Sequence, residues 1–212
     1  MTDQKRGKLI VLEGVEGAGK TTQIPLLENF LKSNKIPVVT TLEPGGTAVG
    51  RRIREVLLDP SLPSMAALTE LLLYNAARAQ HVEEVIKPAL DAGTYVLCDR
   101  FSDSTLAYQG YGRGLDQKVI NRLDEIATGG LIPDLTIILD LPINVGLGRN
   151  AGAGKIDRME LESMEFHERV KNGFHEIAFR KPHAVLVSAE GSPEDVQKRL
   201  QKTIQEQLHL CL

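Results

Sequence analysis

The stretch LIVLEGVEGAGKTTQ, Leu9 to Gln23, constrains the fold of this chain more than any other. It begins with a run of Leu, Ile and Val residues, which is typical of a strand buried on both faces. Three glycines then stand within six residues, followed by a lysine and two threonines. Glycine reaches backbone conformations that are closed to other residues, so such a loop can turn successive N–H groups inward around an anion. The stretch therefore predicts a buried strand, an anion-binding loop and a helix, in that order.

The loop matches a phosphate-binding pattern. Residues 14–21 fit G-x-x-x-x-G-K-[ST] at each fixed position, and the strand and helix predicted around them are the context that this pattern requires. Lys20 is expected to reach the β- and γ-phosphates of a nucleoside triphosphate, and the Thr21 hydroxyl to bind Mg²⁺. A turn needed for strand–helix packing is the alternative. The residues predicted to hold the triphosphate are Gly14, Val15, Glu16, Gly17, Ala18, Gly19, Lys20, Thr21 and Thr22.

Apolar runs of strand length recur along the chain and alternate with segments of helical periodicity. The runs span residues 8–13, 36–41, 94–99, 135–140 and 183–188. The helical segments span residues 20–33, 64–92, 116–128, 142–150, 160–180 and 192–209. This alternation indicates a parallel sheet with crossover helices. We expect one α/β domain over residues 1–212, with five parallel strands flanked by helices.

The segment 64–92 is long for a single helix and contains Pro88 near its end. We expect a helix capped by Ser64 that bends or ends near Lys87, because proline cannot continue the hydrogen-bond ladder. Two helices joined by a short turn are the alternative.

Composition and charge limit the class of partner. The chain is 42% hydrophobic and 25% charged, an ordinary globular composition, and has a net charge of −3, which gives no basic field for nucleic acid. No apolar stretch approaches the ~18 residues of a membrane span, and the N-terminal apolar run is too short for a secretory signal. Two distant cysteines, Cys98 and Cys211, favour a reduced compartment. We expect small-molecule partners in the cytoplasm, and neither nucleic acid nor a membrane.

A phosphate loop alone does not name the reaction. A GTPase needs N-K-x-D to read guanine, and the nearest match, NKIP at 34–37, lacks the aspartate. Motor ATPases are usually larger and carry additional modules. A compact chain with many scattered arginines suits a kinase, which neutralises two sets of phosphates. A nucleotide-dependent switch or assembly ATPase, which would hydrolyse ATP without an acceptor, is the alternative from another class.

A second group of polar residues follows the predicted strand at 94–99. Asp99 and Arg100 stand at its carboxyl end, where open parallel sheets gather their ligand-binding residues. Asp99 is placed to sit beside Mg²⁺ and Arg100 to fork onto an acceptor phosphate. Asp140, which follows another predicted strand, is either a second metal ligand or a turn residue before Pro142.

Two further segments carry residues suited to a nucleotide. Tyr74 and Arg78 lie four apart on one predicted helix face, where they are placed to stack on a base and bond its edge. A core tyrosine beside a surface arginine is the alternative for this pair. The segment 101–114 offers hydroxyl and amide groups that could read a base and crowd a sugar, from Ser104, Thr105, Tyr108 and Gln109.

Taken together, these stretches resemble the thymidylate kinase family of the bacterial type. The matching pieces, in the family's order over roughly residues 8–190, are EGVEGAGKTTQ, EPGGT, YNAARAQ, DRFSDSTLAYQGYGRGL, PDLTIILD and DRME. The resemblance implies transfer of the γ-phosphoryl group of ATP to dTMP with Mg²⁺, in the synthesis of dTTP. It also implies a three-layer P-loop kinase fold with strand order 2-3-1-4-5, and a homodimer packed through helices.

The resemblance also implies roles for single residues. Tyr74 matches an aromatic that stacks on thymine, Arg78 an arginine at the base edge, and Tyr108 a tyrosine that disfavours a ribose 2′-hydroxyl. Glu16 matches an acidic residue near the sugar 3′-hydroxyl. The acceptor site implied in this way comprises Glu43, Pro44, Arg51, Arg54, Tyr74, Arg78, Arg100, Ser104, Thr105, Tyr108 and Gln109, with Thr21 and Asp99 at the metal.

Two departures from the family pattern stand out. Leu42 replaces the arginine that usually precedes Glu-Pro-Gly-Gly, so Arg51 or Arg54 is expected to take its place near the acceptor phosphate. The expected mobile lid at about residues 148–160 is rich in glycine and alanine where relatives carry arginines, and its glycines indicate a segment that orders on closure. The residues expected to act in catalysis are Lys20, Arg100, Asp99, Glu16, Lys155, Arg158 and Arg149.

The nearest rival reading on the same fold is a kinase for another nucleotide or for a deoxynucleoside. The pair formed by Asp99 and Arg100 argues for a phosphorylated acceptor, because a neutral nucleoside needs no arginine cluster.

Overall fold

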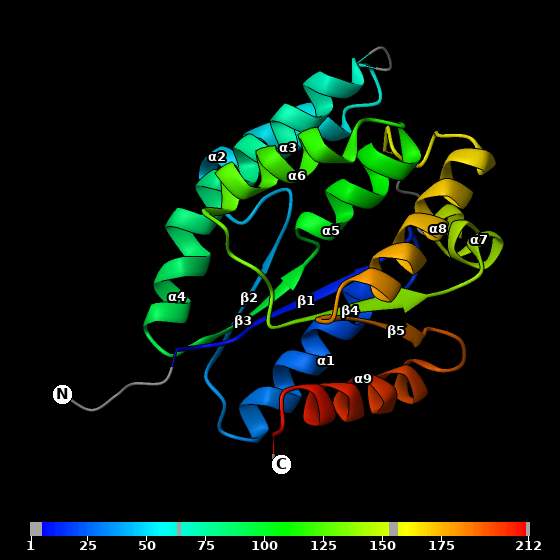
Figure 1. Ribbon diagram of the computed structural model, residues 1–212. Coiled ribbons are helices and arrows are strands. Elements are labelled where there is room, and N and C mark those ends of the chain that lie inside the picture. The colour runs from blue at the N-terminus through cyan, green and yellow to red at the C-terminus, as the bar shows by residue number, and fades with distance from the viewer. Residues whose placement is uncertain (1–5, 63–64, 153–156, 211–212) are drawn as a thin grey trace.

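The computed structural model describes residues 6–62, 65–152 and 157–210 (Figure 1). It contains a five-stranded parallel sheet in the order β2-β3-β1-β4-β5, which confirms the predicted topology. The strands are β1 (Leu9–Gly14), β2 (Val38–Leu42), β3 (Tyr95–Asp99), β4 (Leu135–Asp140) and β5 (Ala184–Ser188). Each lies within one or two residues of an apolar run in the sequence.

Helices cover both faces of the sheet (Figure 1). They are α1 (Lys20–Ser33), α2 (Ala48–Leu58), α3 (Ala67–His81), η1 (Val82–Ile86), α4 (Lys87–Asp91), α5 (Ser102–Thr105), η2 (Leu106–Gly112), α6 (Gln117–Thr128), α7 (Ile143–Gly152), α8 (Met164–Arg180) and α9 (Pro193–Gln207). Helices α1 and α9 pack on one face, whereas α4, α5 and α8 pack on the other. No helix in the described ranges has the length and apolar character that a membrane crossing requires.

The central strand is apolar on both faces because it is covered from both sides. All six residues of β1 are buried. Successive side chains of a strand point to opposite faces, so Ile10 and Leu12 pack in the core cluster that includes Leu27 and Leu31 of α1. Leu9 and Val11 instead join Val82, Ile86 and Leu90 beneath η1 and α4. This two-sided burial explains the continuous apolar run.

The segment 64–92 differs in detail from its prediction. Helix α3 begins at Ala67 with Ala66 at its N-cap position, so the predicted Ser64 cap is wrong, and Ser64 itself lies outside the described residues. Residues 67–91 then follow one helical path rather than two helices joined by a turn. The path widens into the π-helical segment η1 directly before Pro88. A π-helical turn absorbs a local break in the regular hydrogen-bond ladder, which is what a proline creates.

Helix α2 was missing from the sequence prediction. The Pro-Gly-Gly run before it reads as a loop, which masks the start of the helix. The structure shows the signal that starts it: Oγ1 of Thr47 accepts a hydrogen bond from the Gly50 amide at 2.9 Å. This is the usual N-cap geometry.

The phosphate loop packs backbone to backbone against α7. A Cβ built on Gly146 would lie 2.3 Å from the carbonyl oxygen of Glu16, and one on Gly17 would lie 2.0 Å from that of Gly146. Gly148, on the same helix, has nothing within 4 Å of such a Cβ.

We predict that Gly146→Ala lowers the free energy of unfolding by about 1–3 kcal/mol, because the methyl group forces the loop and helix apart. The matched Gly148→Ala should leave stability unchanged or raise it by up to ~1 kcal/mol, because alanine favours a helix. Urea unfolding of both variants checks this. Equal effects of the two substitutions would mean that the close approach is not needed.

Candidate active site

The phosphate loop has the backbone shape that its glycines permit. Gly14, Gly17 and Gly19 have φ values of 138°, 69° and 100°. Lys20 begins α1 and is 8% exposed, and its Nζ donates to the carbonyl oxygens of Gly14 at 2.9 Å and Val15 at 3.1 Å. Burial and the nearby Arg100 lower the pKa of Lys20 to about 8, although three carboxylates around it act in the opposite direction. The predicted strand, loop and helix are thereby confirmed.

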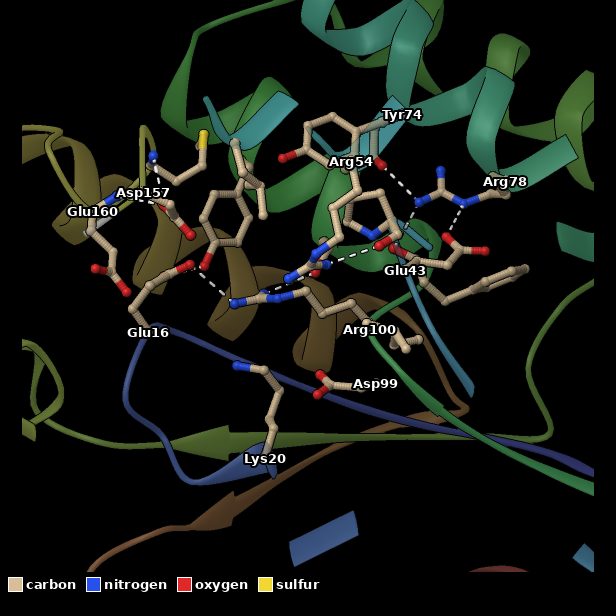
Figure 2. Close-up of a pocket in the computed structure, with 18 of the residues that line it drawn as sticks. Glu16, Lys20, Glu43, Arg54, Tyr74, Arg78, Asp99, Arg100, Asp157 and Glu160 are labelled. Atoms are coloured by element: carbon tan, nitrogen blue, oxygen red, sulfur yellow. Dashed lines mark hydrogen bonds and ion pairs between the residues drawn. The ribbon is translucent and has the colours of Figure 1, made fainter. Parts of the chain in front are cut away.

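Arg100 occupies a strained position at the end of β3. Its φ of 69° lies in the left-handed region, which ordinary residues rarely adopt and which recurs at functional sites. The backbone N–H donates to Leu12 at 3.0 Å, which ties this turn to β1. The guanidinium donates to Ser104 Oγ and to Glu16 Oε1, both at 3.1 Å. Arg100 is thus aimed at the phosphate loop (Figure 2).

Glu16 of the phosphate loop is hydrogen-bonded to Tyr108 of η2. The Tyr108 hydroxyl donates to Glu16, and the Arg100 guanidinium lies 5.1 Å from the centre of the Tyr108 ring. Burial raises the pKa of Glu16, but Arg100, Lys20 and the Tyr108 hydroxyl outweigh it and hold the pKa below its ordinary value. Glu16 is therefore a charged acceptor at neutral pH.

A cavity of about 280 Å³ opens in front of these residues (Figure 2). Fifteen predicted site residues line it together: Glu16, Gly17, Lys20, Thr21, Glu43, Pro44, Arg54, Tyr74, Arg78, Asp99, Arg100, Ser104, Thr105, Tyr108 and Gln109. They come from the phosphate loop, the start of α1, the ends of β2 and β3, helices α2, α3 and α5, and η2. The fold therefore brings these predicted residues together around one cavity.

A second cavity, of about 560 Å³, lies on the other side of the loop. Its lining comprises Gly17, Ala18, Gly19, Lys20, Thr21, Thr22, Gln23, Arg149, Ala189, Gly191, Pro193 and Val196. Nη1 of Arg149 reaches the carbonyl oxygen of Gly17 at 3.4 Å. Gly17, Lys20 and Thr21 belong to both cavities, so the two meet at the lysine.

Two predicted arginines, Arg51 and Arg158, lie outside both cavity linings, and a third predicted residue is not described. Arg51 is exposed and, unlike Arg54, does not contribute to either described cavity. Arg158 is 4% exposed, pairs with Glu70 and donates to the carbonyl oxygen of Leu57 at 2.9 Å. Lys155 lies outside the described residues.

Asp140 has structural partners at the end of β4. Its Oδ1 contacts His175 Nε2 at 2.9 Å and Lys171 Nζ at 3.5 Å, both from α8. Neither cavity lining includes it among the described residues. Of the two readings for Asp140, the geometry favours the structural one and leaves Asp99 as the aspartate beside Lys20.

Arg78 is nearly fully buried and uses most of its donors inside the protein. Nε donates to Glu43 at 2.8 Å and Nη1 to Asp124 at 3.0 Å. Nη2 donates to the carbonyl oxygen of Phe101 at 3.0 Å and to Thr105 Oγ1 at 2.9 Å. A guanidinium has five N–H groups, so one N–H, on Nη1, is left for a ligand.

Gln109 is oriented by a buried carboxylate. Its Nε2 donates a hydrogen bond to Glu70 at 2.7 Å. Glu70 also accepts hydrogen bonds from Arg113 at 3.2 Å. A carboxylate only accepts hydrogen bonds, so the amide nitrogen of Gln109 must face Glu70. Its carbonyl oxygen is then the atom that remains for the cavity.

Several residues of the site were missed from the sequence. Glu70 and the cavity residue Leu58 gave no local signal, whereas Asp157, Met159 and Glu160 lie in the matching piece DRME but were not predicted as site residues. The wall of the second cavity at residues 189–196 was also missed, although the sequence carries a signal for it. A Gly-Ser-Pro run follows β5 at its carboxyl end, where such sheets bind ligands.

Glu13, also missed, is fully buried at the end of β1. It accepts hydrogen bonds from the amides of Phe101 at 2.8 Å and Ser104 at 3.0 Å, and from Ser104 Oγ at 2.5 Å. It thereby fixes the start of α5 beside Arg100. Burial raises the pKa of Glu13 to about 7, against the opposing effects of Arg100 and of these hydrogen bonds.

Comparison with known proteins gives one consistent result. The family model described as Thymidylate kinase matches residues 12–200. A thymidylate kinase of Carboxydothermus hydrogenoformans is 52% identical over 191 residues, covering 90% of this chain and 93% of the relative. One of a Synechococcus species is 53% identical over 205 residues, covering 95% and 96%. A crystal structure of thymidylate kinase from Ehrlichia chaffeensis matches with a TM-score of 0.78 at 34% identity, covering 94% of this chain and all of that one.

We predict that Glu13→Gln changes the pH dependence of stability. At pH values between the ordinary glutamate pKa of 4.5 and the pKa of about 7 in the folded protein, Glu13 binds more protons in the folded state than in the unfolded state. This residue's contribution to stability is therefore present at low pH and is lost as the pH rises through 7. When the pH is raised from 5 to 7.5, the free energy of unfolding of the variant should rise relative to that of the wild type by on the order of 1–3 kcal/mol. Urea unfolding at both pH values measures it.

The exposed Glu206→Gln serves as the control for this experiment, since its carboxylate pairs loosely with Lys202 at 3.8 Å. It should show no comparable gain. A constant difference between Glu13→Gln and the wild type at both pH values would contradict a buried, proton-binding Glu13.

Proposed function

The chain belongs to the thymidylate kinase family, which phosphorylates dTMP, and we propose how its own residues transfer the γ-phosphoryl group of ATP to that acceptor. The observation that carries the proposal is that two cavities share Gly17, Lys20 and Thr21. A phosphoryl group held by Lys20 faces a donor on one side and an acceptor on the other. Catalysis of this kind depends mainly on positioning and on neutralising phosphate charge.

The larger cavity is the ATP site in this proposal. The phosphate-loop amides and the N-terminus of α1 bind the triphosphate, and the wall at residues 189–196 receives the nucleoside. Both Thr21 and Asp99 line the smaller cavity, and in this proposal their hydroxyl and carboxylate would hold Mg²⁺, an ion that takes few protein oxygens and keeps phosphate and water ligands. When bound, Mg²⁺ neutralises charge on the β- and γ-phosphates.

Cations around the smaller cavity suit an acceptor phosphate. Arg100 and Arg54 both line it, and Nη1 of Arg54 is fixed by the carbonyl oxygen of Pro44 at 2.8 Å. Leu42 also lines it, at the position where the family pattern implies an arginine. Because Arg51 is exposed and outside the lining, Arg54 is the residue that takes over this position.

The base end of the cavity presents one donor and one acceptor. Arg78 offers its remaining Nη1–H, and Gln109 its carbonyl oxygen. A 4-oxo pyrimidine with a protonated N3, such as thymine, has the complementary pattern, whereas cytosine has the reverse one. Tyr74 supplies a half-buried aromatic face beside them for stacking.

The pair of Glu16 and Tyr108 suits a deoxyribose. The Glu16 carboxylate is charged and lies between Arg100 and Tyr108, where it can accept a hydrogen bond from a 3′-hydroxyl. Tyr108 cannot move aside easily, because Phe166 and Phe174 pack against its ring at centroid distances of 6.2 and 6.1 Å. Its bulk would exclude a 2′-hydroxyl.

We propose that residues 148–160 form a lid on the single domain 1–212. Arg149 is the lid cation that lines the ATP cavity, and Lys155 is assigned the same task on the sequence alone. Arg158 pairs with Glu70 and is instead proposed to anchor the end of the lid to α3.

We further propose a cytoplasmic homodimer. Large apolar side chains are exposed on α2, α3 and α6, which pack side by side (Figure 1): Val49, Val56, Leu68, Leu72, Val119 and Ile126. Exposed apolar side chains gathered on adjacent helices are typical of an interface. A second copy of the chain is the occupant that fits, because one helical face can meet the same face of its copy about a two-fold axis.

The acceptor assignment is tested by ADP release from ATP with a panel of monophosphates. We expect dTMP to react fastest. For dCMP, two mismatched polar contacts of about 1 kcal/mol or more each should lower kcat/KM at least ~30-fold. Ribothymidine monophosphate should be slower by roughly one to two orders of magnitude, because Tyr108 blocks its 2′-hydroxyl. ATP hydrolysis at one rate with or without any acceptor would favour the switch or assembly ATPase.

The dimer is tested with Leu72→Glu, which places a charge at a 48% exposed position on α3. We expect a monomer by sedimentation equilibrium. Phe179→Glu is the matched control: Phe179 is 88% exposed on α8, away from this face, and its substitution should leave the dimer intact. Dissociation by both variants, or by neither, would argue against this interface.

A further inference from the structure

A row of buried polar side chains runs behind the base end of the acceptor cavity. Thr41 Oγ1 lies 2.6 Å from His81 Nε2, and His81 Nδ1 lies 2.9 Å from Glu43 Oε1. Glu43 Oε2 in turn accepts from Arg78 Nε at 2.8 Å. Figure 2 shows the last of these contacts, with Glu43 and Arg78 facing each other beside the cavity. The row connects the end of β2 to the last turn of α3.

His81 is held rigidly in this row. It is 0% exposed and, unlike Glu43 and Arg78, is not part of the cavity lining, so its contribution passes through them. A Cβ built on Gly46 would lie 2.6 Å from His81 Cδ2 and Nε2, which shows how closely the loop after β2 covers the ring. Both ring nitrogens have partners and the ring itself is covered.

The protonation pattern follows from the partner. A carboxylate only accepts, so Nδ1 of His81 carries a proton and donates it to Glu43. The two oxygens of Glu43 are then divided between His81 and Arg78. Without the His81 donor, one buried oxygen would lose its partner and the carboxylate could rotate away from Nε. Arg78 would then keep Asp124 as its ionic partner, and the Asp124 side chain is 22% exposed.

We propose that His81 is a positioning residue for the acceptor base: by holding Glu43, it fixes the plane in which Arg78 presents its remaining N–H. The inference rests on the proposed role of Arg78 in reading the base. It predicts that changes at His81 weaken acceptor binding and leave ATP binding unchanged, since the ATP cavity shares none of these residues.

Two substitutions separate this role from a structural one. The amide nitrogen of asparagine can take the place of Nδ1, so His81→Asn keeps the contact to Glu43 and gives up the one to Thr41. The amide of glutamine reaches the place of Nε2, so His81→Gln keeps Thr41 and gives up Glu43. Each variant loses one buried hydrogen bond, which makes them matched controls for stability.

We expect His81→Gln to raise the KM for dTMP about five- to tenfold, the effect of a weakened charge-assisted hydrogen bond, with the KM for ATP within twofold. His81→Asn should keep the dTMP KM within about threefold of the wild type. The Arg78 Nε–H signal in ¹⁵N NMR, assigned with Arg78→Lys, should persist in the asparagine variant and broaden in the glutamine variant.

Equal dTMP KM values in the two variants, or parallel changes for dTMP and ATP, would overturn the positioning role. If Arg78→Lys leaves the dTMP KM unchanged, the base-reading assignment itself fails, a result distinct from failure at His81 alone. Should His81→Gln not fold, the wild-type protein still decides: the His81 Nδ1 signal, assigned with His81→Asn, should shift on addition of dTMP but not of ADP. No shift with dTMP would refute the proposal.

Discussion

Carboxylates hold two arginines of the smaller cavity, Arg78 and Arg100, in place. Glu43 holds Arg78, and the pair Glu13 and Glu16 lies against Arg100. An arginine left alone would fold back or take up several conformations, and a phosphate or base needs it in one. Buried ion pairs cost desolvation, so they are weak evidence of added stability. Here each carboxylate also accepts further hydrogen bonds, which offsets that cost and fixes the direction of the guanidinium.

The sheet order explains how these pairs meet. β2, β3 and β1 are neighbours, and their carboxyl ends supply Glu43, Arg100 and Glu13 in that order. No shorter-range element could bring them together, because they come from positions separated by tens of residues. The parallel arrangement also sets all three ends beside the phosphate loop. The strand order is therefore what brings Arg100 close to Lys20.

Local sequence signals were sufficient for the strands and the phosphate loop. A run such as LIVLE is buried on both faces and reads as a strand by itself, and Gly14 to Thr21 form one continuous motif. The partners of Glu13, Glu70 and His81 could not be found in this way, because those residues contact groups 38 to 91 positions away. Arg158 shows the same limit: its charge was visible in the sequence, but its pairing with Glu70 depends on how the chain returns to α3.

The helix types mark where the chain departs from regular geometry to serve the site. Tyr108 and Gln109 both lie in η2, a π-helical segment, and His81 immediately precedes the other one, η1. A π-helical turn rotates the side chains before it relative to those after it about the helix axis, and such turns often occur at functional sites. In η2 the turn lets Tyr108 face Glu16 while Gln109 faces Glu70. The packing of α8 against η2, with Phe166 on the Tyr108 ring, then holds that otherwise unfavourable geometry in place.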